Sequence, residues 1–238
     1  MPAHPFALGE IEVFFLDLAK AASILEAEES GSPRLSASDN ARAAATRDPE
    51  ARRLWRASRI ATRIVLERAC GPSIRQADFA IEPGGRPRLA AGLPWFNISH
   101  TGEAALIAAS KSVPVGVDLE RRHRSLKMPA ERRQRVIAAA GRLGPEHVLS
   151  ADRDSDVMVA WVCLEAAAKA LGIGIGRLLT EQGVVGGNAA GSSYNLQVRT
   201  LDLGDDYVAA VAAERLPEKI GVLPFPADNL DGFIPTRS

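Results

Sequence analysis

Two groups of polar residues flank an apolar segment between residues 96 and 120, and their types suit chemistry at a shared site. Asn97, Ser99 and His100 precede the apolar run, and Asp118 and Glu120 follow it. In the stretch PVGVDLE, hydrophobic residues alternate with the others, so a strand places both carboxylates on one face. Alone, such a pair is more typical of a solvated strand face than of a functional site.

The stretch SDVMVAWVCLEAAAKALG adds a third acid on a predicted helix. Trp161, Glu165 and Lys169 are four residues apart and share one helix face, where Glu165 and Lys169 by themselves would form an ordinary surface ion pair. Together with Asp118 and Glu120, three carboxylates would repel one another and raise one another's pKa unless a cation neutralised them. Oxygen ligands with room for water and phosphate suit Mg²⁺.

Basic residues form a second set of candidates. Arg86 lies in the turn GGRP, whose glycines allow backbone and guanidinium to approach an anion. His100, beside Ser99, is a candidate donor to phosphate, although a solitary histidine is more often structural. Four arginines share one face of the first predicted helix: Arg52, Arg56, Arg59 and Arg63. They can be interpreted as a phosphate-binding row or as a solvated flank.

The elements that must position these residues form two similar halves. EIEVFFLDL predicts a strand, residues 39–70 a long helix, and WFNISH and AALIAAS two further strands. A second helix follows, with Ser155 as its N-cap and Gly172 at its end, and then strands in SYNLQVRTLDL and YVAAVAAE. The interval from helix end to last strand is about 34 residues in the first half and about 36 in the second. This similarity indicates duplication of one α/β unit.

Composition limits the class of protein. The 238 residues are 46% hydrophobic and 24% charged, and 29 basic residues balance 29 acidic ones, so the overall charge predicts no polyanionic partner. The first residues lack the basic start of a signal peptide, and no apolar run is long enough to span a membrane. Two cysteines, Cys70 and Cys163, are too few for a disulfide framework and suit the reducing cytoplasm.

Four motifs, GRP, NISH, GVDLE and W-x-x-x-E-A-x-x-K-A-x-G, follow in this order over residues 42–176. They resemble those of 4′-phosphopantetheinyl transferases of the larger, surfactin-synthetase-activator type. The resemblance implies an α/β (α+β) fold of two lobes related by pseudo-twofold symmetry, with coenzyme A and Mg²⁺ in the cleft between them. The predicted domains are 1–112 on the coenzyme A side, 113–215 with the metal carboxylates, and an extension, 216–238. Since one chain would supply both sides of the cleft, we expect a monomer.

The activity that the resemblance implies is transfer of 4′-phosphopantetheine from coenzyme A to a serine of an acyl or peptidyl carrier protein, with release of 3′,5′-ADP. Asp118, Glu120 and Glu165 match the family's Mg²⁺ carboxylates. Glu165 is the best candidate to take the serine proton, and Glu120 a weaker one. Lys169 matches a lysine that reaches phosphate, and it would stabilise developing charge together with His100.

The resemblance also implies contacts to coenzyme A. Arg86 stands where the family has a basic contact to the nucleotide end, and Ser99 and His100 match nucleotide and phosphate contacts. Arg42 and Arg53 fall near the family's basic contacts in the N-terminal helices, with no motif to fix their register. Lys169 would bind phosphate as well as act in catalysis.

Local charge points to a protein partner. Residues 121–142 contain seven Arg and one Lys against one Glu, a net charge of about +7. Such a segment beside the metal site would steer an acidic carrier protein. A solvated helix flank and nucleic-acid binding are the alternatives, and the absence of aromatic residues for base stacking disfavours the second.

Two features depart from the family pattern. Leu164 precedes Glu165 where the family usually has lysine, and residues 121–160 contain no Phe, Tyr or Trp. They support an alternative, a coenzyme A-binding or scaffold protein that has lost transfer. A basic adaptor with no coenzyme A site is a third interpretation. Whether the carrier serves fatty-acid, polyketide or nonribosomal-peptide synthesis stays open, as does acceptance of acyl-coenzyme A.

Overall fold

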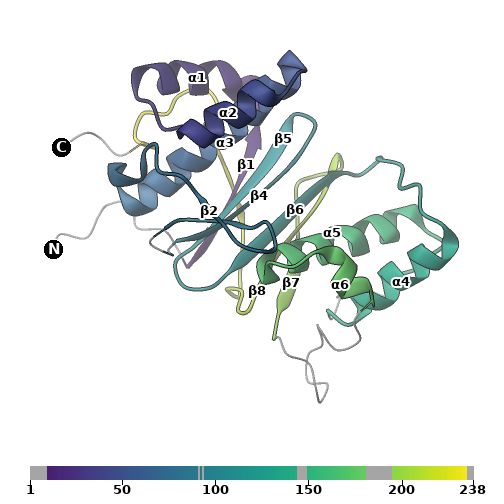
Figure 1. Cartoon of the computed structure of the whole chain (residues 1–238). Helices are drawn as coiled ribbons and strands as arrows, with labels where there is room; N and C mark the ends of the chain where they lie inside the picture. Colours follow the sequence, from purple (N-terminus) through teal and green to yellow (C-terminus); the bar gives the residue numbers. More distant parts are fainter. Residues whose placement is uncertain (1–9, 91, 93, 144–148, 181–194, 235–238) are drawn as a thin grey trace.

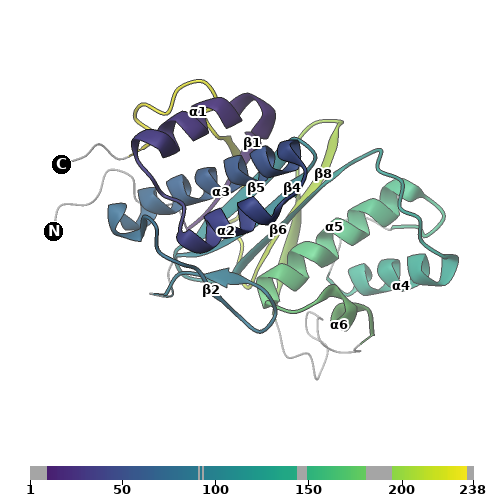
Figure 2. The ribbon, with the colours of Figure 1, turned by 45° about the horizontal axis from the view of Figure 1, so that its top comes forward.

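The computed structural model describes residues 10–90, 92, 94–143, 149–180 and 195–234 (Figure 1). Helices and strands are mixed, and the helices gather in two groups on opposite sides of the strands, as both ribbon views show (Figure 2). Residues 193 and 194, at the start of the strand predicted in SYNLQVRTLDL, lie outside the described residues. None of the described helices is long and apolar enough to cross a bilayer.

The first half is a sheet with helices on one face. Its strands are β1 (Ile11–Asp17), β4 (Trp95–Thr101) and β5 (Ala104–Ser110), and its helices α1 (Leu18–Gly31), α2 (Ala37–Ala45) and α3 (Pro49–Cys70). Strand β5 pairs antiparallel with both β1 and β4. A short hairpin of β2 (Ala80–Ile81) and β3 (Pro87–Arg88) follows the helical turn Pro72–Ile74.

The second half repeats this strand pairing. Strand β8 (Tyr207–Ala213) pairs antiparallel with β6 (Val115–Arg121) and with β7 (Gln197–Leu201). The helices of this half are α4 (Ala130–Gly141), α5 (Asp154–Leu171) and α6 (Ile175–Thr180). In each half the last strand therefore lies between the other two, with a helix before the last two strands. This recurrence agrees with the predicted duplication, whereas an exact pseudo-twofold relation stays a prediction.

Hydrophobic packing arranges the halves in layers. One core lies between the first sheet and α1 and α3, and another lies between the second sheet and α4 and α5. A third core joins the two sheets, with Val13 and Leu106 from the first and Val117 and Val211 from the second, all fully buried. The order is helices, sheet, sheet, helices. The predicted domain boundary at residue 112 falls between β5 and β6.

The structure corrects two local predictions. The long helix expected over residues 39–70 is two helices, because Thr46 ends α2 and Asp48 caps α3 in extended conformations, with Pro49 in the first turn. Ser155 is not the N-cap of α5, which begins at Asp154 after Arg153, without a side-chain cap. Gly172 does end this helix, in the left-handed conformation.

The C-terminal extension packs as a strap on the first half. Strand β9 (Val222–Pro224) pairs in parallel with β1 at the edge of the first sheet. Phe225 and Leu230 are buried in the core under α1 and α3. The described part of this extension, up to residue 234, therefore completes the first half.

Candidate functional site

The two halves meet along strands β4 and β6, which belong to different sheets and are joined by side chains. Asn97 Oδ1 accepts a hydrogen bond of 3.0 Å from the Val117 backbone N–H. Ser99 Oγ accepts one of 3.3 Å from the Leu119 N–H. Alternate residues of a strand share a face, so the polar residues of NISH that point toward β6 are two apart. We call this junction of β4 and β6 the seam.

Asp118 lies in the seam with only one carboxylate oxygen satisfied. Its Oδ1 accepts hydrogen bonds from Lys169 Nζ at 2.7 Å and Ser99 Oγ at 2.8 Å. Its Oδ2 is buried and has no hydrogen-bond partner among the described residues. Buried carboxylate oxygens are normally paired, so an oxygen left in this state marks a place for a cation or an ordered water.

Helix α5 reaches the seam because of a glycine in β6. A Cβ at Gly116 would stand 2.1 Å from the Ala166 carbonyl oxygen and 2.4 Å from the Ala170 nitrogen. Only a residue without a side chain allows the helix to lie this close to the strand. The close approach places Lys169 Nζ within hydrogen-bonding distance of the Val117 carbonyl oxygen, at 3.1 Å, as well as of Asp118.

The other two predicted carboxylates are close enough to Asp118 to feel its charge. Glu120 is ion-paired with Arg124 and accepts a 3.1 Å hydrogen bond from Thr101 Oγ1. Burial raises the pKa of Glu120, and Asp118 raises it further, against the opposing effect of Arg124. Burial also raises the pKa of Glu165, and the charges of Asp118 and Glu120 add to this effect.

These three carboxylates supply the oxygen ligands that Mg²⁺ prefers, and the unpaired Asp118 Oδ2 fits a cation. As the side chains lie, however, no group of three or more His, Cys, Asp or Glu among the described residues stands close enough to hold a metal. Lys169 covers Asp118 Oδ1, and Arg124 covers one oxygen of Glu120. The donor chemistry fits Mg²⁺, and the Glu120–Arg124 ion pair competes with it.

A cavity of about 230 Å³ lies on the first-half side of β4, beside the seam. Its wall includes Arg42, Trp55 and Arg59 from the helices and Asn97 and His100 from β4. The guanidinium groups of Arg42 and Arg59 lie 5.6 and 5.2 Å from the centre of the Trp55 ring. An aromatic face beside two guanidinium groups can take a flat base and a phosphate, two of the three parts of a nucleotide.

The surroundings of His100 favour its neutral form. Burial lowers its pKa from the ordinary value of 6.5, and the nearby charges of Lys169 and Arg42 lower it further. The positive potential expected from His100 is therefore supplied by Arg42 and Lys169 in the absence of substrate. A phosphate in the cavity would favour the protonated imidazole and raise the pKa of His100.

Of the predicted coenzyme A contacts, Arg53 and Arg86 belong to neither the cavity wall nor the seam. Arg53 is partly exposed and ion-paired with Glu50. Arg86 is ion-paired with Glu82 and donates a 2.6 Å hydrogen bond to the Ala170 carbonyl oxygen of α5.

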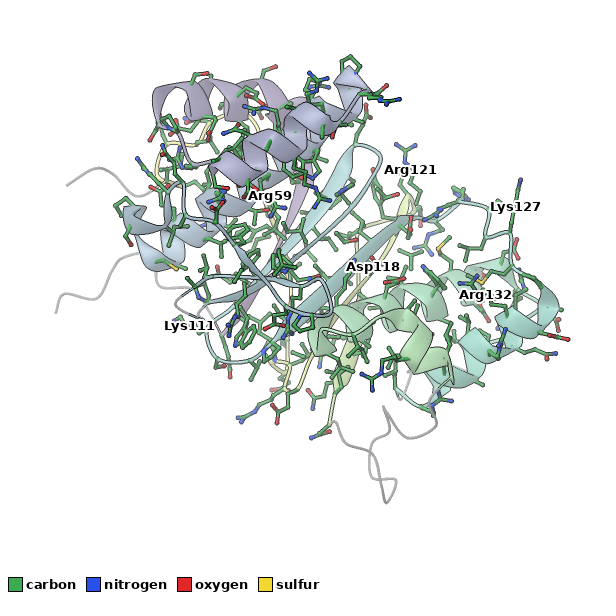
Figure 3. All side chains as sticks on the ribbon, in the orientation of Figure 1. Arg59, Lys111, Asp118, Arg121, Lys127 and Arg132 are labelled. Atoms are coloured by element: carbon green, nitrogen blue, oxygen red, sulfur yellow. The ribbon has the colours of Figure 1, made fainter. Side chains whose placement is uncertain are left out.

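The arginines on the face of α3 are held by other parts of the first half. Arg56 is ion-paired with Glu26 of α1, and Arg59 and Arg63 are ion-paired with Asp39 of α2. Figure 3 shows Arg59 among the helices of the first half. The face is thus largely a helix-to-helix contact, and of these three only Arg59 also lines the cavity.

The basic segment 121–142 covers the chain from the end of β6 to the end of α4. Arg133 is ion-paired with Asp154, and Arg132 lies over the Trp161 ring at 5.5 Å. In Figure 3, Arg121, Lys127 and Arg132 lie on the α4 side of Asp118. This placement brings positive charge to the edge of the seam.

Sequence reasoning misses three residues of this region. Thr101 holds Glu120, and its position two residues after Ser99 on the same strand is the signal that could have found it. Arg124 pairs with Glu120 four residues away, whereas the charge of its segment indicates only a basic surface. Trp55 carries no local signal, because the cavity is formed by residues distant in the sequence.

Leu164 is 1% exposed in the core of the second half. The leucine at this departure from the family motif is therefore a packing residue.

Comparison with known proteins gives three partial relatives. No family model matches the chain. The protein AcpT of Salmonella typhimurium, named a 4′-phosphopantetheinyl transferase, is 30% identical over 122 residues, 49% of this chain and 59% of the relative. AcpT of Salmonella typhi matches to the same extent. The protein slr0495 of Synechocystis sp., provisionally named a 4′-phosphopantetheinyl transferase, is 34% identical over 89 residues, 36% of each chain.

The matched segments thus span about a third to three fifths of these relatives. The likeness is to 4′-phosphopantetheinyl transferases in general, and it does not distinguish the surfactin-synthetase-activator type. The geometry of the seam and of the cavity agrees with this likeness, so 4′-phosphopantetheinyl transferases are the class of protein that the chain is similar to.

Proposed function

We propose that the protein transfers the 4′-phosphopantetheine group of coenzyme A to a serine hydroxyl of an acyl or peptidyl carrier protein and releases 3′,5′-ADP. The observation that carries the proposal is the position of β4 between two kinds of site. Ser99 bonds the carboxylate and lysine of the seam, while the next residue, His100, lines the cavity with Trp55 and Arg42. A nucleotide in the cavity would have its pyrophosphate beside the seam.

The residues of the second half would act on the pyrophosphate. Asp118, Glu120 and Glu165 would hold Mg²⁺, which would offset the charge of the leaving group. Lys169 would leave Asp118 for a phosphate oxygen, and so add positive charge where it develops. Glu165 would also take the proton of the carrier serine.

In the proposed transfer, the serine oxygen forms a bond to the β-phosphorus of coenzyme A. The bond from this phosphorus to the oxygen that bridges the two phosphates breaks, and 3′,5′-ADP leaves with the bonding electrons. Positioning of the two reactants by the cavity and the seam would supply much of the rate. Arg42 is the best-placed basic residue of the first half, whereas Arg53 would bind only after release from Glu50.

The proposed carrier is acidic and docks near residues 121–142. Support comes from the net charge of this segment and from its place at the edge of the seam (Figure 3). The two unpaired cysteines, Cys70 and Cys163, suit a reducing compartment, and we propose the cytoplasm. A monomer is the proposed state.

Intact mass of an apo carrier protein after incubation with this protein, coenzyme A and Mg²⁺ tests the proposal. We expect a gain of one phosphopantetheine that is lost with chelator and with Asp118→Ala. The exposed Asp205, in the turn before β8, provides a matched control, and Asp205→Ala should transfer normally. Binding of coenzyme A without a mass gain on several acidic carriers would instead favour the coenzyme A-binding protein.

A further inference from the structure

The hairpin β2–β3 connects the first half to the end of helix α5. A Cβ at Gly84, in the turn of the hairpin, would stand 1.7 Å from the carbonyl oxygen of Gly172, the residue that ends α5. Hairpin and helix end are therefore in direct backbone contact. The contact depends on two glycines that are 88 positions apart in the sequence.

Arg86 holds this contact from the hairpin side. Its Nη1 donates a 2.6 Å hydrogen bond to the Ala170 carbonyl oxygen, and its Nε donates one of 2.8 Å to Glu82. Its guanidinium lies 4.8 Å from the centre of the Trp95 ring, and its side chain is 10% exposed. A cation that binds a free carbonyl at a helix C-terminus satisfies the carbonyl and complements the helix dipole.

The same hairpin also forms part of the cavity wall. Ile81, Gly85 and Pro87 line the cavity, whereas Arg86, between the last two, bonds α5. Lys169, the residue before Ala170, donates to Asp118 and Ser99 in the seam. The hairpin thus contacts the cavity on one side and the turn of α5 that carries Lys169 on the other.

We propose that the β2–β3 hairpin is a clasp and that Arg86 is its positioning residue. Arg86 fixes the last turn of α5, and thereby the place of Lys169, relative to the cavity. This role differs from the nucleotide contact that the family resemblance implies for Arg86. The inference rests on the proposed function only for its effect on transfer, because the contact itself can be measured without substrate.

Kinetics of Arg86→Met separate the two roles. A positioning role predicts a fall in kcat of about tenfold, because Lys169 is misplaced for the reaction, whereas loss of a nucleotide contact alone would raise the Kd for coenzyme A and leave kcat unchanged. Gly84→Ala should give the same result without any change of charge. Arg88→Met is the matched control and should retain full kcat, because Arg88 is on the same hairpin and near the same Glu82, away from the Ala170 carbonyl.

Amide hydrogen exchange of the free protein measures the clasp directly. We expect Arg86→Met and Gly84→Ala to speed exchange at residues 169–173, with no such change in Arg88→Met. A raised Kd for coenzyme A with unchanged kcat would make Arg86 a nucleotide contact and overturn the proposal. Unchanged exchange in both clasp variants would also overturn it. If the wild type transfers nothing to any carrier, the proposed function fails, while local exchange still decides for or against the clasp.

Discussion

Two buried aspartates, one in each half, differ in how their charge is compensated. Asp39 in α2 has both oxygens paired, Oδ1 with Arg59 at 3.2 Å and Oδ2 with Arg63. Asp118 in the seam has Oδ1 paired with Lys169 and Oδ2 unpaired among the described residues. The side chains are almost equally buried, at 7% and 8% exposed. Asp39 therefore holds helices together, whereas Asp118 keeps one oxygen open to a cation or an ordered water.

The largest expected effect is on the stability of the first half. Asp39→Asn should lower the free energy of unfolding by about 3 kcal/mol, because it leaves two buried guanidinium groups without their counter-charge. Asp118→Asn should cost about 1 kcal/mol or less, since the side chain of Lys169 is 28% exposed and can regain water. Urea unfolding of both variants measures the contrast. Equal losses would remove the distinction between the two aspartates.

The region of Asp118 also differs from that of Asp39 in the pH dependence of its stability, because His100 lies at the neighbouring cavity. Since its pKa is lowered by burial and by Lys169 and Arg42, the folded protein takes up this proton less readily than the unfolded chain. Its contribution to stability is therefore complete above pH 6.5 and is lost as the pH falls through the folded-state pKa. His100→Gln should reduce the loss of stability between pH 7 and pH 5.

Titration of the His100 ring by NMR, with and without 3′,5′-ADP, tests whether the cavity binds phosphate near His100. Its pKa should lie below the ordinary value in the free protein and rise when 3′,5′-ADP is added. A pKa that 3′,5′-ADP leaves unchanged would contradict the presence of phosphate near His100.

The smallest effect should come from Arg124, which competes for Glu120. Its side chain is 54% exposed, so the ion pair is weak, and Arg124→Met should lower the Mg²⁺ concentration for half-maximal transfer by about twofold. Lys127→Met removes the same charge from the same segment without freeing Glu120. The two variants should therefore differ, and a rise in the Mg²⁺ requirement of Arg124→Met would show that the pair supports the site. Calorimetric titration with Mg²⁺ measures the affinity of each variant for the metal without the carrier protein.

The sequence by itself determined the main strands, the helix α5 and the candidate residues for metal binding and catalysis. Alternation in PVGVDLE and the four-residue spacing in α5 depend only on the local periods of strand and helix, and these periods place Asp118 with Glu120 and Glu165 with Lys169. The order of the motifs supplied the likeness to 4′-phosphopantetheinyl transferases. The end of α5 at Gly172 was also predicted, because a left-handed residue with no Cβ is a local requirement.

Only the tertiary structure decided which charges are compensated and which are not. In the sequence, four arginines share one face of α3 and look alike. In the structure, ion pairs with Glu26 and Asp39 make most of this face a contact between helices. Arg86 lies 84 residues from Ala170, the partner that its guanidinium binds. Such pairings depend on how separate elements pack, and desolvation and nearby charge, which set the pKa of His100, exist only after packing.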